Sequence, residues 1–287
     1  MDFDPGSLTL ACTAPAAVGA GHPVSGRVSD TDFIVPVGQA DGIRAGTLAG
    51  MCGRYASTRS VADLSELFDA IDETDGELVA DYNIAPTDPV PIVRVSARVT
   101  SPVITVARWG LVPAWARDRS GAARMINARA ETVSTARAFA TSFAQRRCLV
   151  PADGWYEWRR RVNGGKQAYY MTRPEGLAFA GVWSVWGTGG DRLLTCSILT
   201  TGAVGDLALV HDRMPLVLPP SAWQDWLTTI DASGLLGQPA EEYAAGIEIR
   251  PVGAAVGDVR NDGPSLICAI DAPSLQESIV DLPPTLF

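Results

Sequence analysis

The chain has 287 residues, of which 47% are hydrophobic, with a formal net charge of −9 and five cysteines. This apolar content can fill the core of one large domain or two small ones. Apolar runs stay below the roughly 18 residues that a membrane span needs, and five cysteines without a CxxC pair indicate neither a disulfide framework nor a structural zinc site. We therefore expect a cytoplasmic protein with no membrane contact, metal or organic cofactor.

The acidic net charge hides a basic segment. Residues 1–50 carry a net charge of −3 and residues 241–287 one of −6, so residues 51–240 are neutral. Within them, residues 104–173 hold thirteen Lys and Arg against four Asp and Glu. Exposed charges farther apart than a Debye length of about 10 Å are largely screened, so this segment can attract phosphates. The alternative is a solvated, arginine-rich surface.

Residues 1–50 are rich in Gly, Ala, Ser, Thr, Pro and Asp and show no helical period. We expect a disordered leader, or a segment outside the working protein that results from a misplaced start. The pattern changes at Met51, and residues 51–287 form the expected domain. The stretch SVADLSELFDAI predicts a helix with Ser60 as N-cap and Asp63 at the capping-box position. Its apolar face comprises Val61, Leu64, Leu67, Phe68 and Ile71.

Short strand-like runs follow at residues 90–96, 103–109, 167–172, 177–186, 193–201, 214–218 and 247–252. Helical patches interrupt them at residues 134–144, with Ser134 as N-cap, and at residues 219–230, with Pro220 near the first turn. The GTGG sequence at 187–190 predicts a hairpin turn. Without regular βαβ alternation, this order predicts an α+β fold around a curved, largely antiparallel sheet or barrel, with a few peripheral helices.

Few residues outside the leader can exchange protons near neutral pH. His211 is the one histidine beyond residue 50, and Asp212 and Arg213 flank it; a lone histidine before a strand is usually structural. Glu157 lies within the aromatic sequence WYEW, and such surroundings raise the pKa of a carboxyl group by desolvation. The alternative is a surface glutamate paired with a neighbouring arginine, Arg159 or Arg160.

Asn127 and Arg129 are two residues apart, so in an extended segment they lie on one face and can meet a ligand together. Cys52 suggests a more specific chemistry. If translation starts at Met51 and that residue is removed, Cys52 presents an α-amine of pKa about 8 beside a thiol of pKa about 8.5. The amine can form a Schiff base with an aldehyde, and the thiol can then close a thiazolidine ring. The alternative is an ordinary small buried thiol.

Eight segments in order, from Met51 to Ile267, together resemble the SRAP family of SOS-response-associated peptidases, also called abasic site processing proteins. The segments are MCGRYA (51–56), YNIAPT (82–87), RWGLVPAWA (108–116), INARAET (126–132), RRCLVPADGWYEW (146–158), ILTT (198–201), HDRMPLVL (211–218) and VRNDGPSLI (259–267). The resemblance implies a protein of the DNA damage response that binds single-stranded DNA. It also implies a covalent crosslink to abasic sites through an N-terminal cysteine.

The resemblance further implies roles for individual residues. Cys52 is the expected nucleophile and Glu157 the acid–base group, with Asn127 and His211 assisting ring opening and Schiff-base chemistry. Further positions are expected to contact DNA: Arg54 and Arg129 hold phosphates, and Asn83, Pro86, Trp109 and Thr200 line the lesion pocket. The expected partner is single-stranded DNA with abasic sites, bound by a monomer that associates with the nucleoid when on DNA.

The leader departs from the family pattern, whose members begin Met-Cys-Gly. An internal Cys52 has its nitrogen in an amide and cannot form the ring, so the crosslinking hypothesis needs a start at Met51 or removal of the leader. Two alternatives remain. One is a cysteine peptidase that uses Cys52, His211 and Asn127, acting mainly on its own N-terminus. The other is a non-catalytic single-strand binder that uses the basic segment.

Overall fold

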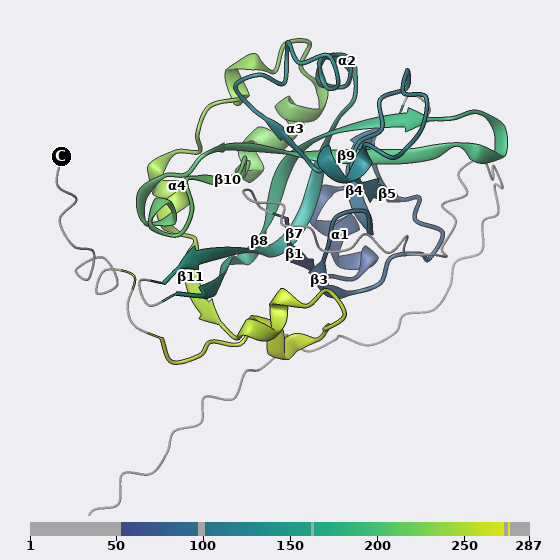
Figure 1. Ribbon diagram of the computed structural model, residues 1–287. Coiled ribbons are helices and arrows are strands. Elements are labelled where there is room, and N and C mark those ends of the chain that lie inside the picture. Colours follow the sequence, from purple (N-terminus) through teal and green to yellow (C-terminus); the bar gives the residue numbers. More distant parts are fainter. Residues whose placement is uncertain (1–52, 97–100, 162–163, 273–274, 276–287) are drawn as a thin grey trace, which may run out of the picture.

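The computed structural model describes residues 53–96, 101–161, 164–272 and 275. In this part of the chain there are four α-helices and one sheet of eleven strands (Figure 1). The expected leader and Cys52 lie outside the described residues. None of the described helices is long and apolar enough to cross a membrane.

Five strands close into a ring in the order β8–β9–β5–β4–β7, because β7 also pairs with β8. Their bounds are β4 (Pro89–Val95), β5 (Pro102–Trp109), β7 (Arg147–Arg160), β8 (Lys166–Trp186) and β9 (Leu193–Gly202). Three more strands extend this sheet: β1 (Tyr55–Ser57) beside β7, β3 (Asp81–Ile84) beside β1, and β11 (Glu248–Val252) beside β8. Off this path, β2 (Ile71–Asp72) pairs with β5, while β6 (Asn127–Arg129) and β10 (Arg213–Pro215) pair with β9.

The observed architecture confirms the predicted α+β fold around a curved sheet. Among the described pairings, β2–β5, β5–β9 and β6–β9 are parallel and the others antiparallel. The GTGG sequence connects β8 to β9, which pair antiparallel, as the turn prediction required. The predicted strands at 167–172 and 177–186 prove to be one long strand, β8.

Side chains of the ring strands alternate between two apolar clusters, as the two-residue period of a strand requires. Val150 belongs to the inner cluster, which has members on all five ring strands, whereas the adjacent Leu149 belongs to the outer cluster. The outer cluster also contains Leu64 of α1 (Val61–Phe68), Phe143 of α2 (Ala140–Gln145) and Trp226 of α3 (Pro220–Thr228). The helices therefore cover the outside of the ring, and the inner cluster fills it.

Local signals predict two of the helix starts correctly. Ser60 Oγ accepts the Asp63 N–H at 3.1 Å, and the Asp63 carboxylate accepts the Ser60 N–H, which confirms the capping box. The helix ends at Phe68 because Asp69 adopts a left-handed conformation with φ of 47°, so Ile71 leaves the predicted apolar face and is exposed in β2. Pro220 lies in the first turn of α3, as predicted.

The N-cap expected at Ser134 is wrong. Residues 131–139 form a series of turns, and α2 begins only at Ala140, with Phe139 as its N-cap residue. Phe139 makes no side-chain capping hydrogen bond. The helix is held by packing instead, through Phe143 in the outer cluster. The remaining helix, α4 (Glu241–Ala245), is a short turn against the inner cluster through Ala244.

The strand β7 was not predicted, because Pro151, Asp153 and Gly154 interrupt its apolar pattern. It pairs with β8 along its whole length, with a register shift between Ala152 and Gly154. Before this bulge the even-numbered Ala152 faces the inner cluster, and after it the odd-numbered Trp155 does. A bulge changes which residues face a given side of a sheet. It therefore places Glu157, two residues after Trp155, on the inner side.

Gly154 allows the strands to approach closely at this bulge. A Cβ atom at this position would lie 2.5 Å from Tyr170 Cζ and even closer to Met171 O. We expect Gly154→Ala to lower the free energy of unfolding by about 3 kcal/mol, because the clash forces β7 and β8 apart. Gly190→Ala is the matched control, since a Cβ there meets nothing within 4 Å, and should change stability by less than about 0.5 kcal/mol. Equal urea midpoints for the two variants would contradict this account.

Candidate active site

The first described residues run along β7 toward Glu157. Tyr55 pairs with Trp155 in antiparallel register, and the Tyr156 N–H donates to Arg54 O at 3.0 Å. Continuing this register by two residues pairs Gly53 with Glu157. Paired residues in antiparallel strands have Cα atoms about 4.5–5.5 Å apart. Gly53, the residue that follows Cys52, thus comes beside Glu157 on the neighbouring strand.

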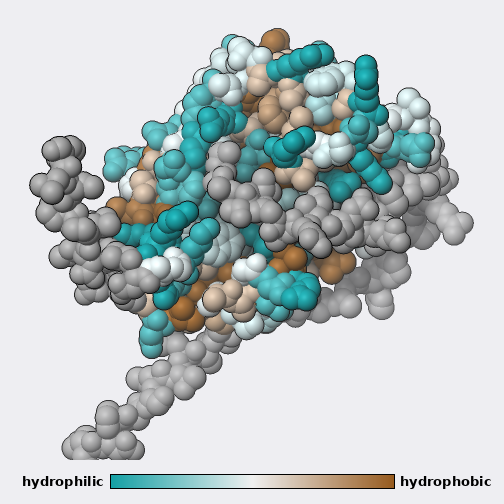
Figure 2. All heavy atoms as spheres, viewed as in Figure 1, coloured by the Kyte–Doolittle hydropathy of each residue, from teal (hydrophilic) through white to brown (hydrophobic). Residues whose placement is uncertain are grey.

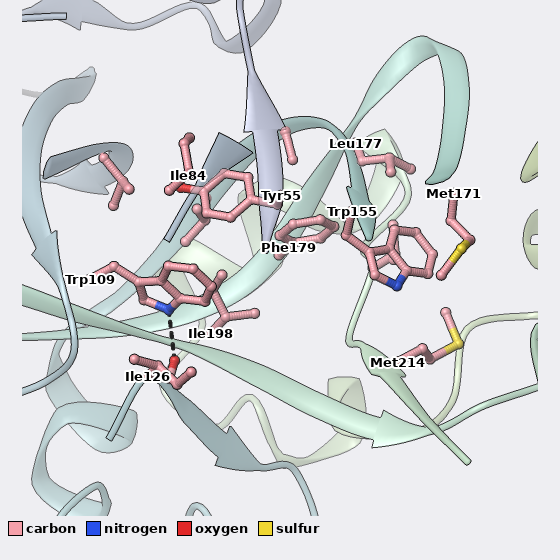
Figure 3. Close-up of a cluster of buried hydrophobic side chains, with 14 of the residues drawn as sticks. Tyr55, Ile84, Trp109, Ile126, Trp155, Met171, Leu177, Phe179, Ile198 and Met214 are labelled. Atoms are coloured by element: carbon pink, nitrogen blue, oxygen red, sulfur yellow. Dashed lines mark hydrogen bonds between the residues drawn. The ribbon is translucent and has the colours of Figure 1, made fainter. Parts of the chain in front are cut away.

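Glu157 is buried in an aromatic and apolar environment. Its side chain is 5% exposed, and Tyr169, directly opposite on β8, is 4% exposed. Trp155 precedes it on the same face, and Figure 3 shows Trp155 beside Met171 and Met214. The aromatic setting predicted from the sequence is confirmed, and the alternative of a surface glutamate is wrong.

Asn127 lies on β6, which runs parallel to β9. It pairs with Ile198, an inner-cluster residue, so the Asn127 amide lies on the inner side of the sheet. Just before Asn127, the Trp109 indole N–H donates to Ile126 O at 2.8 Å (Figure 3). Trp109 was expected to line a lesion pocket, but it is only 1% exposed and packs edge-on against Tyr55. It offers no ring face to a nucleotide, and it anchors the strand that carries Asn127.

His211 lies in the turn before β10, two residues ahead of Arg213, the first residue of that strand. Its Nδ1 accepts the Arg213 N–H at 3.0 Å and also lies 3.0 Å from Asp212 Oδ1. The ring is half-buried, and these contacts hold it in place.

The Arg213 guanidinium joins the elements around His211 and Asn127. It donates to Thr200 O at 2.6 Å and Thr200 Oγ1 at 3.2 Å, and its Nη2 lies 3.0 Å from Glu131 Oε2. This hydrogen bonding by Arg213 lowers the pKa of the Glu131 carboxyl. Thr200 is fully buried and pairs with Arg129 across β6 and β9. Asn127, Arg129 and Thr200 are therefore brought to adjoining positions, with His211 tied to them through Arg213.

Arg54 and Asn83, expected to contact DNA, make their principal contacts within the protein. Arg54 Nη1 donates to Asn83 Oδ1 at 2.6 Å and to Val256 O at 2.9 Å. Asn83 is 3% exposed. Pro86 is half-buried in the turn between β3 and β4, next to Thr87, whose φ is 82°. Pro86 thus keeps an accessible surface that Asn83 lacks.

The basic segment contributes several exposed arginines and one exposed aromatic ring. Trp115 is 57% exposed, and the Arg137 guanidinium carbon lies 4.6 Å from its ring centroid. On the face shown in Figure 2, hydrophobic side chains appear only in patches between hydrophilic ones. The exposed arginines of the segment are Arg117, Arg119, Arg124, Arg129, Arg137, Arg160 and Arg161. Trp115 belongs to the segment RWGLVPAWA, but its position in a loop gave no period from which its exposure could be predicted.

Within the described part of the chain, no three His, Cys, Asp or Glu side chains gather to hold a metal ion. Glu157, Asn127 and His211 lie on three different elements, β7, β6 and the turn before β10. Met214 of β10 and Trp155 of β7 share the inner cluster, which connects the last of these elements to the strand of Glu157. Such a set can transfer protons at a reacting carbonyl group.

Comparison with known proteins gives one consistent result. The sequence model of the SOS response associated peptidase (SRAP) family matches residues 51–259. The abasic site processing protein YoqW of Bacillus subtilis (strain 168) is 34% identical over 226 residues, covering 76% of this chain and 99% of that protein. The abasic site processing protein YedK of Escherichia coli (strain K12) is 33% identical over 232 residues, covering 76% of this chain and 99% of that protein.

A crystal structure of a protein from Bacteroides thetaiotaomicron has the same fold. It superposes with a TM-score of 0.66 at 21% identity and covers 76% of this chain and 100% of that chain. The matched regions therefore include every site residue discussed above, from Gly53 to His211.

The buried Trp109 and the exposed Trp115 allow a paired test of their assignments. We expect Trp109→Phe to lower the free energy of unfolding by about 1–3 kcal/mol, because Ile126 O loses a buried donor. Trp115→Phe, the matched control, should change it by less than about 0.5 kcal/mol. Urea unfolding followed by circular dichroism measures both. If the two variants were equally stable, Trp109 would not anchor β6.

Proposed function

The chain belongs to the SOS response associated peptidase (SRAP) family, and we propose that it processes abasic sites by capturing their aldehyde covalently on Cys52. The observation that carries the proposal is the register of β1 on β7, which directs the residues after Cys52 toward the buried Glu157. Covalent linkage keeps the Cα of residue 52 about 3.8 Å from that of Gly53. An N-terminal Cys52 would therefore begin within reach of the Glu157 carboxyl group.

The chemistry balances without a cofactor. The ring-opened sugar of an abasic site exposes an aldehyde at C1′. The Cys52 α-amine adds to this carbon and water leaves, which gives a Schiff base. The Cys52 thiol then adds to the same carbon, its proton passes to the nitrogen, and a five-membered thiazolidine results. One water is released overall and nothing is oxidised or reduced.

We assign the proton transfers in these steps to Glu157. Loss of water from the amine adduct needs a proton donor at the hydroxyl, and a carboxyl group beside the reacting carbon supplies it. Asn127, on the inner side of β6, can hold the sugar hydroxyl or the aldehyde oxygen by its amide. His211, whose ring is held by Arg213 and Asp212, is the proposed group that accepts or returns a proton during ring opening. The support for these roles is the position of Glu157 and Asn127 on the inner side of the sheet and the link from His211 through Arg213 to Thr200.

The basic segment is the proposed surface for single-stranded DNA. Its exposed arginines supply charge for phosphates, and Trp115 supplies a ring on which an unpaired base can stack. Pro86 keeps a half-buried surface that can pack at the gap left by a missing base. The relatives YoqW and YedK, named as abasic site processing proteins, support a damaged DNA strand as the substrate.

The crosslinking step can be tested in the full chain. The residues just before Cys52 are replaced by the recognition sequence of a site-specific protease, so that cleavage after purification leaves Cys52 first. We expect a denaturation-resistant adduct with single-stranded DNA that carries one abasic site, formed by the cleaved protein alone. Cys52→Ser should abolish the adduct, and Glu157→Gln should slow its formation at least tenfold.

The uncleaved protein is the matched control, because only the acylation of one nitrogen differs. Equal adduct formation before and after cleavage would rule out the thiazolidine mechanism. Hydrolysis of a peptide spanning Met51–Cys52 without any adduct would favour the cysteine peptidase alternative. Salt-sensitive binding with neither product would favour the non-catalytic single-strand binder.

Charge and stacking at the DNA surface predict different responses to salt. For Arg129→Gln, we expect weaker binding of intact single-stranded DNA and a log K against log salt slope that is shallower by about 0.7, the contribution of one phosphate contact. Trp115→Ala should weaken binding about fivefold or more with an unchanged slope, because stacking releases no counterions. Fluorescence anisotropy at several salt concentrations measures both. An unchanged affinity in both variants would show that single-stranded DNA binds to a different surface of the protein.

A further inference from the structure

We propose that Arg54, Asn83 and the loop at residues 256–261 form a latch that positions Cys52 for reaction, so that Arg54 and Asn83 are positioning residues. This inference rests on the proposed function, because it concerns the nucleophile of that same site. It differs from the roles expected from the family resemblance, in which Arg54 holds a phosphate and Asn83 lines the lesion pocket.

Three N–H donors of Arg54 bind protein acceptors. Nη1 donates to Asn83 Oδ1 at 2.6 Å and to Val256 O at 2.9 Å, and Nη2 lies 3.5 Å from Gly257 O. These two carbonyls end the short 3₁₀ turn at Ala254–Gly257. These contacts use three of the five N–H donors of the guanidinium, including both on Nη1, and they fix the side chain against the loop.

Asn83 uses both ends of its amide, which fixes its orientation. Oδ1 accepts from Arg54, whereas Nδ2 donates to Asp258 O at 3.0 Å and Asn261 O at 2.8 Å. Its main-chain N–H donates to Asp81 Oδ1 at 2.7 Å. At 3% exposure the amide has no access to a ligand, so Asn83 serves as the link between Arg54 and the loop.

The charge of Arg54 is also balanced within the protein. Burial lowers the pKa of Arg54, and the nearby carboxyl groups of Asp88, Asp258 and Asp81 act in the opposite direction. Burial in turn raises the pKa of Asp81 and Asp88. A cation with acidic groups on several sides contributes little net attraction for an approaching phosphate. The Arg54 guanidinium is therefore better suited to fixing the chain within the protein than to binding a phosphate.

The latch acts on the main chain two residues from Cys52. Arg54 O accepts the Tyr156 N–H at 3.0 Å, so residue 54 is held by β7 through its backbone and by the loop through its side chain. Tyr156 Oη in turn donates to Tyr82 O at 2.7 Å, one residue before Asn83. Chain ends fray unless they are tied down. A misplacement of about 1 Å at a reacting group can cost about 100-fold in rate.

The test uses the full chain with the protease site before Cys52, cleaved and verified by mass. We expect Arg54→Gln and Asn83→Asp to slow the first-order adduct rate at saturating abasic single-stranded DNA at least tenfold. Affinity for intact single-stranded DNA should stay within about twofold. Because both changes break one latch, the double variant should be no slower than the slower single variant. Gln224→Glu is the matched control, because it makes the same amide-to-carboxylate change at an exposed position of α3, outside the latch, and it should change neither quantity.

Exchange of the Tyr156 amide hydrogen reports the latch without DNA. It should quicken at least tenfold in Asn83→Asp and stay unchanged in Gln224→Glu. Weaker DNA binding with an unchanged adduct rate would make Arg54 a phosphate contact and overturn the proposal, as would unchanged Tyr156 exchange. If the parent protein forms no adduct, the proposed function fails, whereas the exchange measurement still decides on the latch.

Discussion

An N-terminal nucleophile reacts efficiently only if the residues that follow it are fixed in position. In this fold, pairing of β1 with β7 fixes them. Tyr55 and Ala56 pair with Trp155 and Gly154, and the bulge at Gly154 turns Glu157 to the inner side of the ring. The same strand therefore carries the acid–base group and guides the start of the domain toward it. The ring of five strands makes this placement rigid, because β7 is paired on both sides.

Signals confined to a few residues were predictable from the sequence. The capping box at Ser60 and Asp63 and the proline that opens α3 depend only on local backbone geometry, and both are confirmed. The strands around residues 90–109 and 193–201 were also found, because continuous apolar runs mark buried strands. The failure at Ser134 arose because a cap signal does not secure a helix; turns at residues 131–139 delay its start.

The sequence did not show which residues contact one another across the fold. β7 escaped detection because its bulge and its charged residues are explained only by the strands beside it. The sequence left open whether Glu157 is buried among aromatic residues or exposed on the surface, and the structure shows that it is buried. Trp109 and Trp115 lie six residues apart in one motif, yet one is buried under β6 and the other is exposed to solvent. Basic residues divide in the same way: Arg147 is buried and donates to Phe143 O and Trp226 O, whereas Arg129 is exposed.

The chemistry of the site depends on the state of one nitrogen atom, which the fold can position but cannot liberate. Mass spectrometry of the protein isolated from its own cells tests this most directly. The account predicts that the N-terminal peptide of the mature protein begins with Cys52 and bears an unmodified α-amine. A mature chain that retains Met1, or a Cys52 whose nitrogen stays acylated, would contradict it.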